Sequence, residues 1–145
     1  MKDQSSDPTR WDLSDATARI FSGGSPLPAT RHIRIPITLP SVLYGQPVRV
    51  TGITVYYKCM NSAQAYIAET ELYKQLDADS SVPLINDTVH RTSGTATSYS
   101  LATDSANNIL SSSQGIVSLR IGIFFNDDTN YVQIGGVRVT LDHTY

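Results

Sequence analysis

The chain lacks the features that mark secreted, membrane-spanning or nucleic-acid-binding proteins. Its 145 residues include a single cysteine, Cys59, so no internal disulfide can form. There is no charged start followed by an apolar stretch, and no run approaches the ~18 apolar residues of a membrane span. The 11 lysines and arginines are scattered, and the formal net charge is -2. We expect a protein made in the cytoplasm without a signal peptide, with no nucleic-acid partner and no membrane insertion.

Motifs for catalysis are also missing. His32, His90 and His143 lie far apart in the sequence, and they show neither metal-ligand spacing nor a nucleophile pattern. Glu69 and Glu71 are the only glutamates, and at positions i and i+2 of one strand they would point the same way, about 6.5 to 7 Å apart. A glycosidase instead holds its carboxylates on opposing walls of a cleft. We therefore expect no catalytic residue, no cofactor and no metal ligand, and predict that the chain is not an enzyme.

Two acidic segments contain residues that calcium sites use. Asp77 and Asp79 form one of them, and Asp127 and Asp128 form the other. Neither segment matches a recognised calcium-binding loop, whereas tight turns prefer Asp and Asn for backbone reasons. We interpret both segments as turns.

Apolar and polar residues alternate along much of the chain, which predicts an all-β protein. Strict alternation gives each strand one buried and one wet face, as in antiparallel sheets packed around a core. The pattern predicts an antiparallel two-sheet β-sandwich, jelly-roll-like, with seven or eight strands and an extended N-terminal arm. Strands are expected at 32–40, 47–59, 66–74, 82–89, 96–102, 116–125 and 131–142, with an eighth candidate at 16–21.

Two hairpins, each with one β-bulge, also follow from the alternation. Pairing Phe125 with Val132 aligns the inward residues of the last two strands. Inward positions then change from even to odd at Gly135-Gly136, which predicts a bulge there. The same change at Thr51-Gly52 predicts a second bulge, in a strand expected to pair with 66–74. Cys59 falls on the inward face of that strand, where it is interpreted as a small buried core residue.

Residues 1–31 differ in composition from the rest and are interpreted as an arm and joint, followed by a sandwich domain over 32–145. The arm is polar, with the apolar residues Trp11, Leu13, Ile20 and Phe21 set among Ser, Asp, Thr and Gly. An isolated tryptophan in such a segment is costly to leave in water. Trp11 either covers one end of its own sandwich or docks on a neighbouring subunit, and the sequence leaves both open.

Four charged residues are further interface candidates. In the predicted hairpin Arg120 lies directly opposite Arg138 on the outer face, where like charges repel. A carboxylate between them would reverse that repulsion, and in a homo-oligomer Glu69, Glu71 or a terminal carboxylate of a neighbour could supply it. Alternatively, both arginines extend into solvent.

Three segments resemble β-sandwich modules of phage-type structural proteins, such as tail-fibre heads and virion decoration proteins. They are VRVTGITVYYKC (48–59), SYSLATDSANNILSSSQG (98–115) and NYVQIGGVRVTLDH (130–143). The resemblance implies a non-enzymatic structural or attachment module, trimer-forming or capsid-attached, that contacts other structural proteins of a virion or extracellular assembly. It carries over no functional residue.

The alternative function is a carbohydrate-binding module. Tyr56, Tyr66, Tyr73, Tyr99 and Tyr131 would supply aromatic surface for stacking on surface glycans, and a glycan-binding assay separates this alternative from pure assembly.

Overall fold

A computed structural model describes residues 9–14, 16–111 and 115–143, which form strands and connecting loops. Residues 1–8 of the expected arm and the terminal carboxylate lie outside the described residues. The strands, in chain order, are β1 (Thr9–Ser14), β2 (Thr17–Ser22), β3 (Ala29–Thr38), β4 (Val42–Leu43), β5 (Gln46–Cys59), β6 (Ala65–Gln75), β7 (Ser81–Asp87), β8 (Thr97–Ala102), β9 (Ile109–Leu110), β10 (Ile116–Phe125) and β11 (Tyr131–His143).

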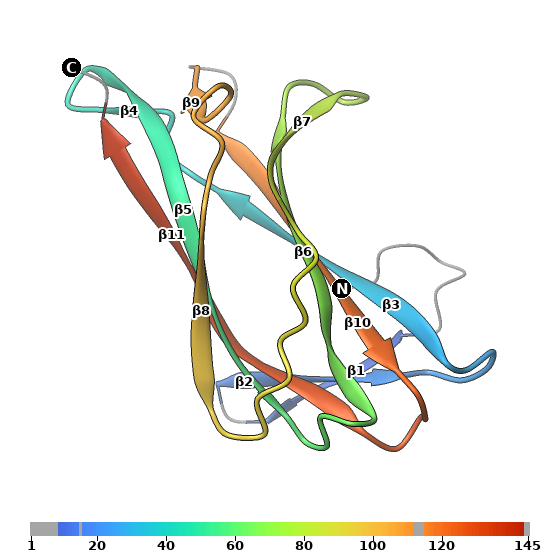
Figure 1. Ribbon diagram of the computed structural model, residues 1–145. Helices are drawn as coiled ribbons and strands as arrows, with labels where there is room; N and C mark the ends of the chain where they lie inside the picture. The colour runs from blue at the N-terminus through green and yellow to red at the C-terminus, as the bar shows by residue number, and fades with distance from the viewer. Residues whose placement is uncertain (1–8, 15, 112–114, 144–145) are drawn as a thin grey trace.

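Two antiparallel sheets pack face to face, as Figure 1 shows. One sheet has the order β3-β10-β6-β7, and the other runs β1-β2-β11-β5-β4, with β8 and β9 also paired to β5. If β1 and the two-residue strands β4 and β9 are left out and the remaining eight strands are numbered one to eight in chain order, the sheets read 2-7-4-5 and 1-8-3-6. This is the strand order of a jelly roll. The predicted fold class is confirmed.

The core lies between the sheets and consists of the residues that the alternation placed inward. Val55, Leu119, Ile121 and Phe125 are fully buried, with exposed fractions of 0%. Tyr99 is also inward, and its hydroxyl group forms a hydrogen bond with that of Thr70. Among the described residues no helix is long and apolar enough to cross a membrane.

Both predicted β-bulges are present. The β11–β5 register shifts between Ile134 and Gly136, and it shifts again where Thr140 pairs with Gly52 and Leu141 with Val50. The second shift leaves Thr51 as the extra residue of β5. Each bulge moves the inward face from even to odd positions, so the long strands keep one apolar side on the core.

The two predicted hairpins are wrong. β10 and β11 belong to different sheets, and so do β5 and β6. Their connecting loops cross the sandwich, and the two loops meet at one end, where the Asn126 amide N–H donates to the Gln64 carbonyl over 2.8 Å. Alternation shows which side of a strand faces inward. It does not show whether the next strand pairs with it in the same sheet or faces it across the core, because the inward residues are apolar in both cases.

Pro36 lies on an edge strand, where a residue without a backbone N–H is tolerated. β3 lies at the edge of its four-stranded sheet, with Ile33 buried and Pro36 exposed on the outer face. At the edge of the other sheet, β1 and β2 form a hairpin, and β2 pairs with the first residues of β11. The expected strand at 16–21 is therefore present, and β1 is an additional strand.

Candidate functional site

One lateral side of the sandwich is open, between β3 of one sheet and the second half of β11 of the other. β2 pairs with β11 only from Tyr131 to Ile134. Beyond that point the facing inward residues of both strands are half-buried rather than buried. They are aliphatic on both walls: Ile35 and Ile37 on β3 with Leu39 just after it, and Val137, Val139 and Leu141 on β11.

The β1–β2 hairpin extends this apolar surface at one end. Trp11, Leu13, Ala18 and Ile20 line a cavity of about 270 Å³ together with Ile33, Ile35 and Ile134. A neighbouring cavity of about 360 Å³ continues from Leu13 to Ile37 and Val137. We call the surface lined by these hairpin, β3 and β11 residues the lateral cleft.

Trp11 and Leu13 are the exposed part of the lateral cleft. Their exposed fractions are 45% and 71%, whereas Ile20 is 4% exposed and belongs to the core. Phe21 lies elsewhere, with its ring 5.1 Å from the Tyr131 ring and under the Arg10 guanidinium. Of the four apolar arm residues predicted for an interface, the structure thus brings Trp11, Leu13 and Ile20 together and places Phe21 apart.

The predicted Arg120–Arg138 pair does not exist, because the two residues belong to different sheets. Arg138 pairs with Thr54 on β5. Arg120 pairs with Arg34 on one side and with Glu71 on the other, so like charges do face each other across a ladder, but with a different partner.

Glu71 lies on the outer face of its sheet but is largely removed from water. It is 9% exposed and accepts a hydrogen bond from the Arg120 guanidinium over 2.7 Å and one from the Tyr73 hydroxyl over 3.1 Å. The carboxylate expected from a neighbouring subunit is thus supplied by the same chain.

Glu69 also has a partner in its own chain, His32, at 2.5 Å. Gly122 separates them on β10, and a Cβ atom at Gly122 would lie 2.4 Å from the Glu69 Cγ atom. The absence of a side chain at Gly122 therefore lets Glu69 and His32 meet across the middle strand.

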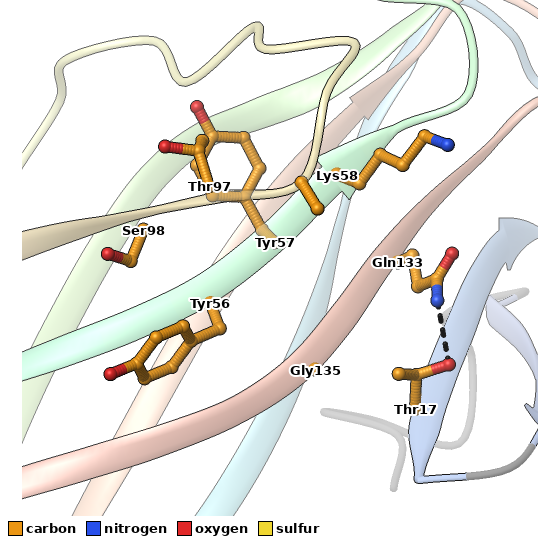
Figure 2. Close-up of a pocket in the computed structure, with 9 residues that line it drawn as sticks. Thr17, Tyr56, Tyr57, Lys58, Thr97, Ser98, Gln133 and Gly135 are labelled. Carbon is orange, nitrogen blue, oxygen red and sulfur yellow. Dashed lines mark hydrogen bonds between the residues drawn. The ribbon is translucent and has the colours of Figure 1, made fainter.

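The outer face of the larger sheet carries a groove of about 420 Å³ beside Tyr56, shown in Figure 2. Tyr56 is 40% exposed, and the bulge residue Gly135 leaves the neighbouring position without a side chain. The Gln133 side-chain amide donates to the Thr17 hydroxyl over 2.8 Å at the far side of the groove. An aromatic ring beside hydroxyl and amide groups is an arrangement that suits a sugar.

The other tyrosines proposed for sugar stacking differ in exposure. Tyr99 is excluded, because it is buried in the core, where burial raises the pKa of its hydroxyl to about 12. Tyr66 is half-buried, and its ring stacks on Phe124 at 5.0 Å.

The acidic segments form turns, as interpreted from the sequence. The Asp127 carboxylate accepts hydrogen bonds from the backbone N–H groups of Thr129 and Asn130, and Asp77 does the same for Asp79 and Ser80. The pKa of the Asp77 carboxyl is lowered by a hydrogen bond with the Ser80 side chain and then by the backbone bonds, and the pKa of Asp127 is lowered by the bonds from Asn130 and Thr129. Within the part of the chain that the structure describes, no three His, Cys, Asp or Glu side chains gather as metal ligands would.

Comparison with known proteins adds no relative: no family model matches the chain, and no curated protein matches it.

Proposed function

We propose that this chain is a non-enzymatic structural or attachment protein of a larger assembly, and that the lateral cleft is its protein contact surface. The assembly is a virion or an extracellular particle, and the chain forms a homo-oligomer, with a trimer favoured by the resemblance to phage-type modules. Jelly rolls occur in both capsid and lectin domains, so the fold is compatible with this role without selecting it.

The proposal rests on the aliphatic side chains that line the lateral cleft and remain only half-buried in the single chain. Large connected apolar surfaces on soluble proteins mark contact sites more often than isolated exposed residues do. Here the aliphatic residues of two facing strands continue into Trp11 and Leu13 on the hairpin. Aromatic residues such as Trp11 are enriched at protein interfaces, because they combine a large contact area with few rotatable bonds.

Sedimentation of the wild-type chain and two variants tests the proposal. The wild type should sediment as an oligomer, and Leu13→Asp should shift it to the monomer because a charge in an apolar interface is not solvated. Val89→Asp is the matched control, since Val89 is 55% exposed but does not line the lateral cleft. Point substitutions are preferable to removal of the arm, because Ile20 on β2 is part of the core.

Circular dichroism should show that both variants keep the fold. A wild-type chain that remains monomeric at high concentration and fails to bind other structural proteins would contradict the proposal. Equal dissociation by Leu13→Asp and Val89→Asp would contradict the choice of surface.

The groove beside Tyr56 supports one alternative, a carbohydrate-binding module. Neutral sugars bound there would stack on the exposed ring and form hydrogen bonds with polar groups such as Lys58 and Gln133. A glycan array tests this directly. Saccharide binding that Tyr56→Ala removes would favour the module, and a chain with no saccharide preference at this groove would exclude it.

A further inference from the structure

The second half of β11 is a sheet edge that runs along the lateral cleft. β2 pairs with β11 only over residues 131–134. In the part of the chain that the structure describes, no strand pairs with this side of β11 over residues 137–142. An edge of this kind presents backbone N–H and C=O groups to which a further strand can bind.

The backbone of β11 shows which residues would bind such a strand. The Thr140 carbonyl accepts a hydrogen bond from the Thr51 hydroxyl over 3.2 Å, so the backbone groups of Thr140 face β5. These groups alternate between the two sides of a strand. The N–H and C=O groups of Val139 and Leu141 therefore point to the open side.

The opposite wall of the lateral cleft is less suited to strand addition. The Leu39 N–H donates to the Gly115 carbonyl over 2.6 Å, so the residues of β3 whose numbers are odd face β10. Pro36 then lies at a position that faces the outer edge, where it has no N–H to donate. β11 contains no proline, which makes it the edge that can accept a complete strand.

The residues of this edge are complementary to a second copy of themselves. Arg138, Thr140 and Asp142 are exposed on the outer face of β11. If residues 138–142 pair antiparallel with the same residues of another copy, each Arg138 lies opposite an Asp142, and Thr140 lies opposite itself. Opposite charges and threonine pairs across a ladder are both favourable.

The charges also select this register from its neighbours. The backbone alternation permits shifts of the register by two residues only. A shift by two places Arg138 or Asp142 opposite Thr140, and both charge pairs are lost. A shift by four places two arginines or two aspartates opposite each other, where they repel. Within its own chain Asp142 lies opposite Arg49 on β5, so the carboxylate would stand between two guanidinium groups.

We propose that β11 pairs antiparallel with β11 of a second copy across a two-fold axis, so that the larger sheets of two chains join into one. On the cleft side, each half-buried Val139 would lie opposite Leu141 of the other copy. The apolar walls of the two lateral clefts then meet and are removed from water. This contact is self-complementary and uses the same surface on both chains.

The pairing rests on the proposal that the lateral cleft is a contact surface, and it names a second copy of the chain as the occupant. A two-fold contact closes after two copies. The chain would therefore form a dimer through β11, in place of the trimer that the resemblance to phage-type modules implies.

Sedimentation of charge variants tests the pairing. Arg138→Asp and Asp142→Arg each replace two attractive pairs by two repulsive ones, so each should weaken dimerisation at least about tenfold. An equimolar mixture of the two variants should restore the dimer, because each introduced charge then faces its opposite on the other chain. Lys58→Asp makes the same charge change at an exposed position of β5 and should leave the dimer unchanged.

A cysteine cross-link tests the register. Thr140 would face itself across the two-fold axis at the ~4.5 Å Cα separation of a non-hydrogen-bonded pair, which is within the range of a disulfide. Mild oxidation of Thr140→Cys should therefore give a covalent dimer. Ser98→Cys, at an exposed position of β8, should remain a monomer under denaturing conditions. The native Cys59 is buried in both variants.

Two sets of results would overturn the pairing. A wild-type trimer, or a variant mixture that stays dissociated, would overturn it and leave the lateral cleft as the contact surface, provided that Leu13→Asp still dissociates the oligomer. A monomeric wild type in which the Val139 amide is protected from hydrogen exchange would show that another segment of the chain covers the edge. A monomer that also binds no other structural protein would contradict the proposed function as well.

Discussion

The middle of the sandwich and its open lateral side are built from the same residue types, yet they differ in burial. Ile121 on β10 is fully buried, whereas Ile37 on β3 and Val139 on β11 are half-buried. β10 has a strand on each side, while β3 is an edge strand and β11 loses its β2 partner after Ile134. Alternation thus fixes the direction in which a side chain points, and the neighbouring strands decide how far it is removed from water.

The largest expected effect on stability comes from making the same substitution, isoleucine to alanine, in each of the two regions. Ile121→Ala should lower the free energy of unfolding by about 2–5 kcal/mol, because it removes methyl groups from a closed core and leaves a cavity. Ile37→Ala should lower it by about 1 kcal/mol, because its side chain is already partly in water. Urea unfolding in the Leu13→Asp background measures both, so that each value reports on a single chain.

Equal losses for the two alanine variants would contradict the comparison. They would mean that the lateral side is as closed in solution as the middle of the sandwich, even without a partner chain.

Alanine substitutions at the glycines of the two bulges compare the closed core with the open side in a second way, with an effect on stability of intermediate size. A Cβ atom at Gly52 would lie 2.6 Å from the Leu101 carbonyl oxygen, so Gly52→Ala must push β8 away from β5. We expect the free energy of unfolding to fall by about 1–3 kcal/mol, which is typical of overpacking. Gly136 faces open space, with no atom within 4 Å of such a Cβ. Gly136→Ala should therefore raise the free energy of unfolding by about 0.4–1 kcal/mol, because alanine reduces the conformational entropy of the unfolded chain.

Thermal unfolding of the two glycine variants gives the sign of each change. A tolerated Gly52→Ala would show that β5 and β8 are less closely paired than the structure indicates. A destabilising Gly136→Ala would show that the bulge on the open side is equally constrained.

The sequence predicted the parity of nearly every strand, because a one-residue shift would turn all apolar residues to solvent. It therefore located the bulges at Thr51-Gly52 and Gly135-Gly136. The sequence could not show which strands pair. Two strands that face each other across the core have the same alternation of apolar and polar residues as two strands paired within one sheet. Lys74 also escaped prediction: it occupies an inward position, is 7% exposed, and donates to the Ile109 carbonyl over 3.0 Å at the end of the core.

The candidate sites were predicted less completely than the fold. Trp11, Leu13 and Ile20 were identified because apolar residues stand out in a polar segment. Ile37 looked like any core residue, since nothing in a local pattern reports a missing neighbouring strand. The pairing of Arg34 with Arg120 was not predicted, because it depends on which sheet β10 joins.

The smallest expected effect concerns the thiol of Cys59 in the closed part of the core. Burial raises its pKa from 9.0 to about 11, so the folded chain holds the thiol proton more tightly than the unfolded chain does. The contribution of the Cys59 thiol to the free energy of unfolding is therefore fully present below pH 9, and it is lost as the pH rises towards 11. The wild type should lose more stability over this interval than Cys59→Ala, measured by urea unfolding at each pH.

Alkylation gives a second measurement of the same thiol. Cys59 should react with iodoacetamide at pH 8 only after unfolding, because the reactive form is the thiolate. Rapid labelling of the folded chain, or an identical pH dependence in Cys59→Ala, would contradict a closed core at this position.

The exposure of Trp11 in solution tests the central claim most directly. It is the only tryptophan, and it is 45% exposed in a single chain, so its fluorescence reports on the lateral cleft alone. If the cleft is a contact surface, acrylamide should quench the wild-type assembly weakly, and Ile37→Asp should increase the quenching and shift the emission to longer wavelength. Equal, strong quenching in the wild type and in Ile37→Asp would show that nothing covers the cleft and would contradict the account.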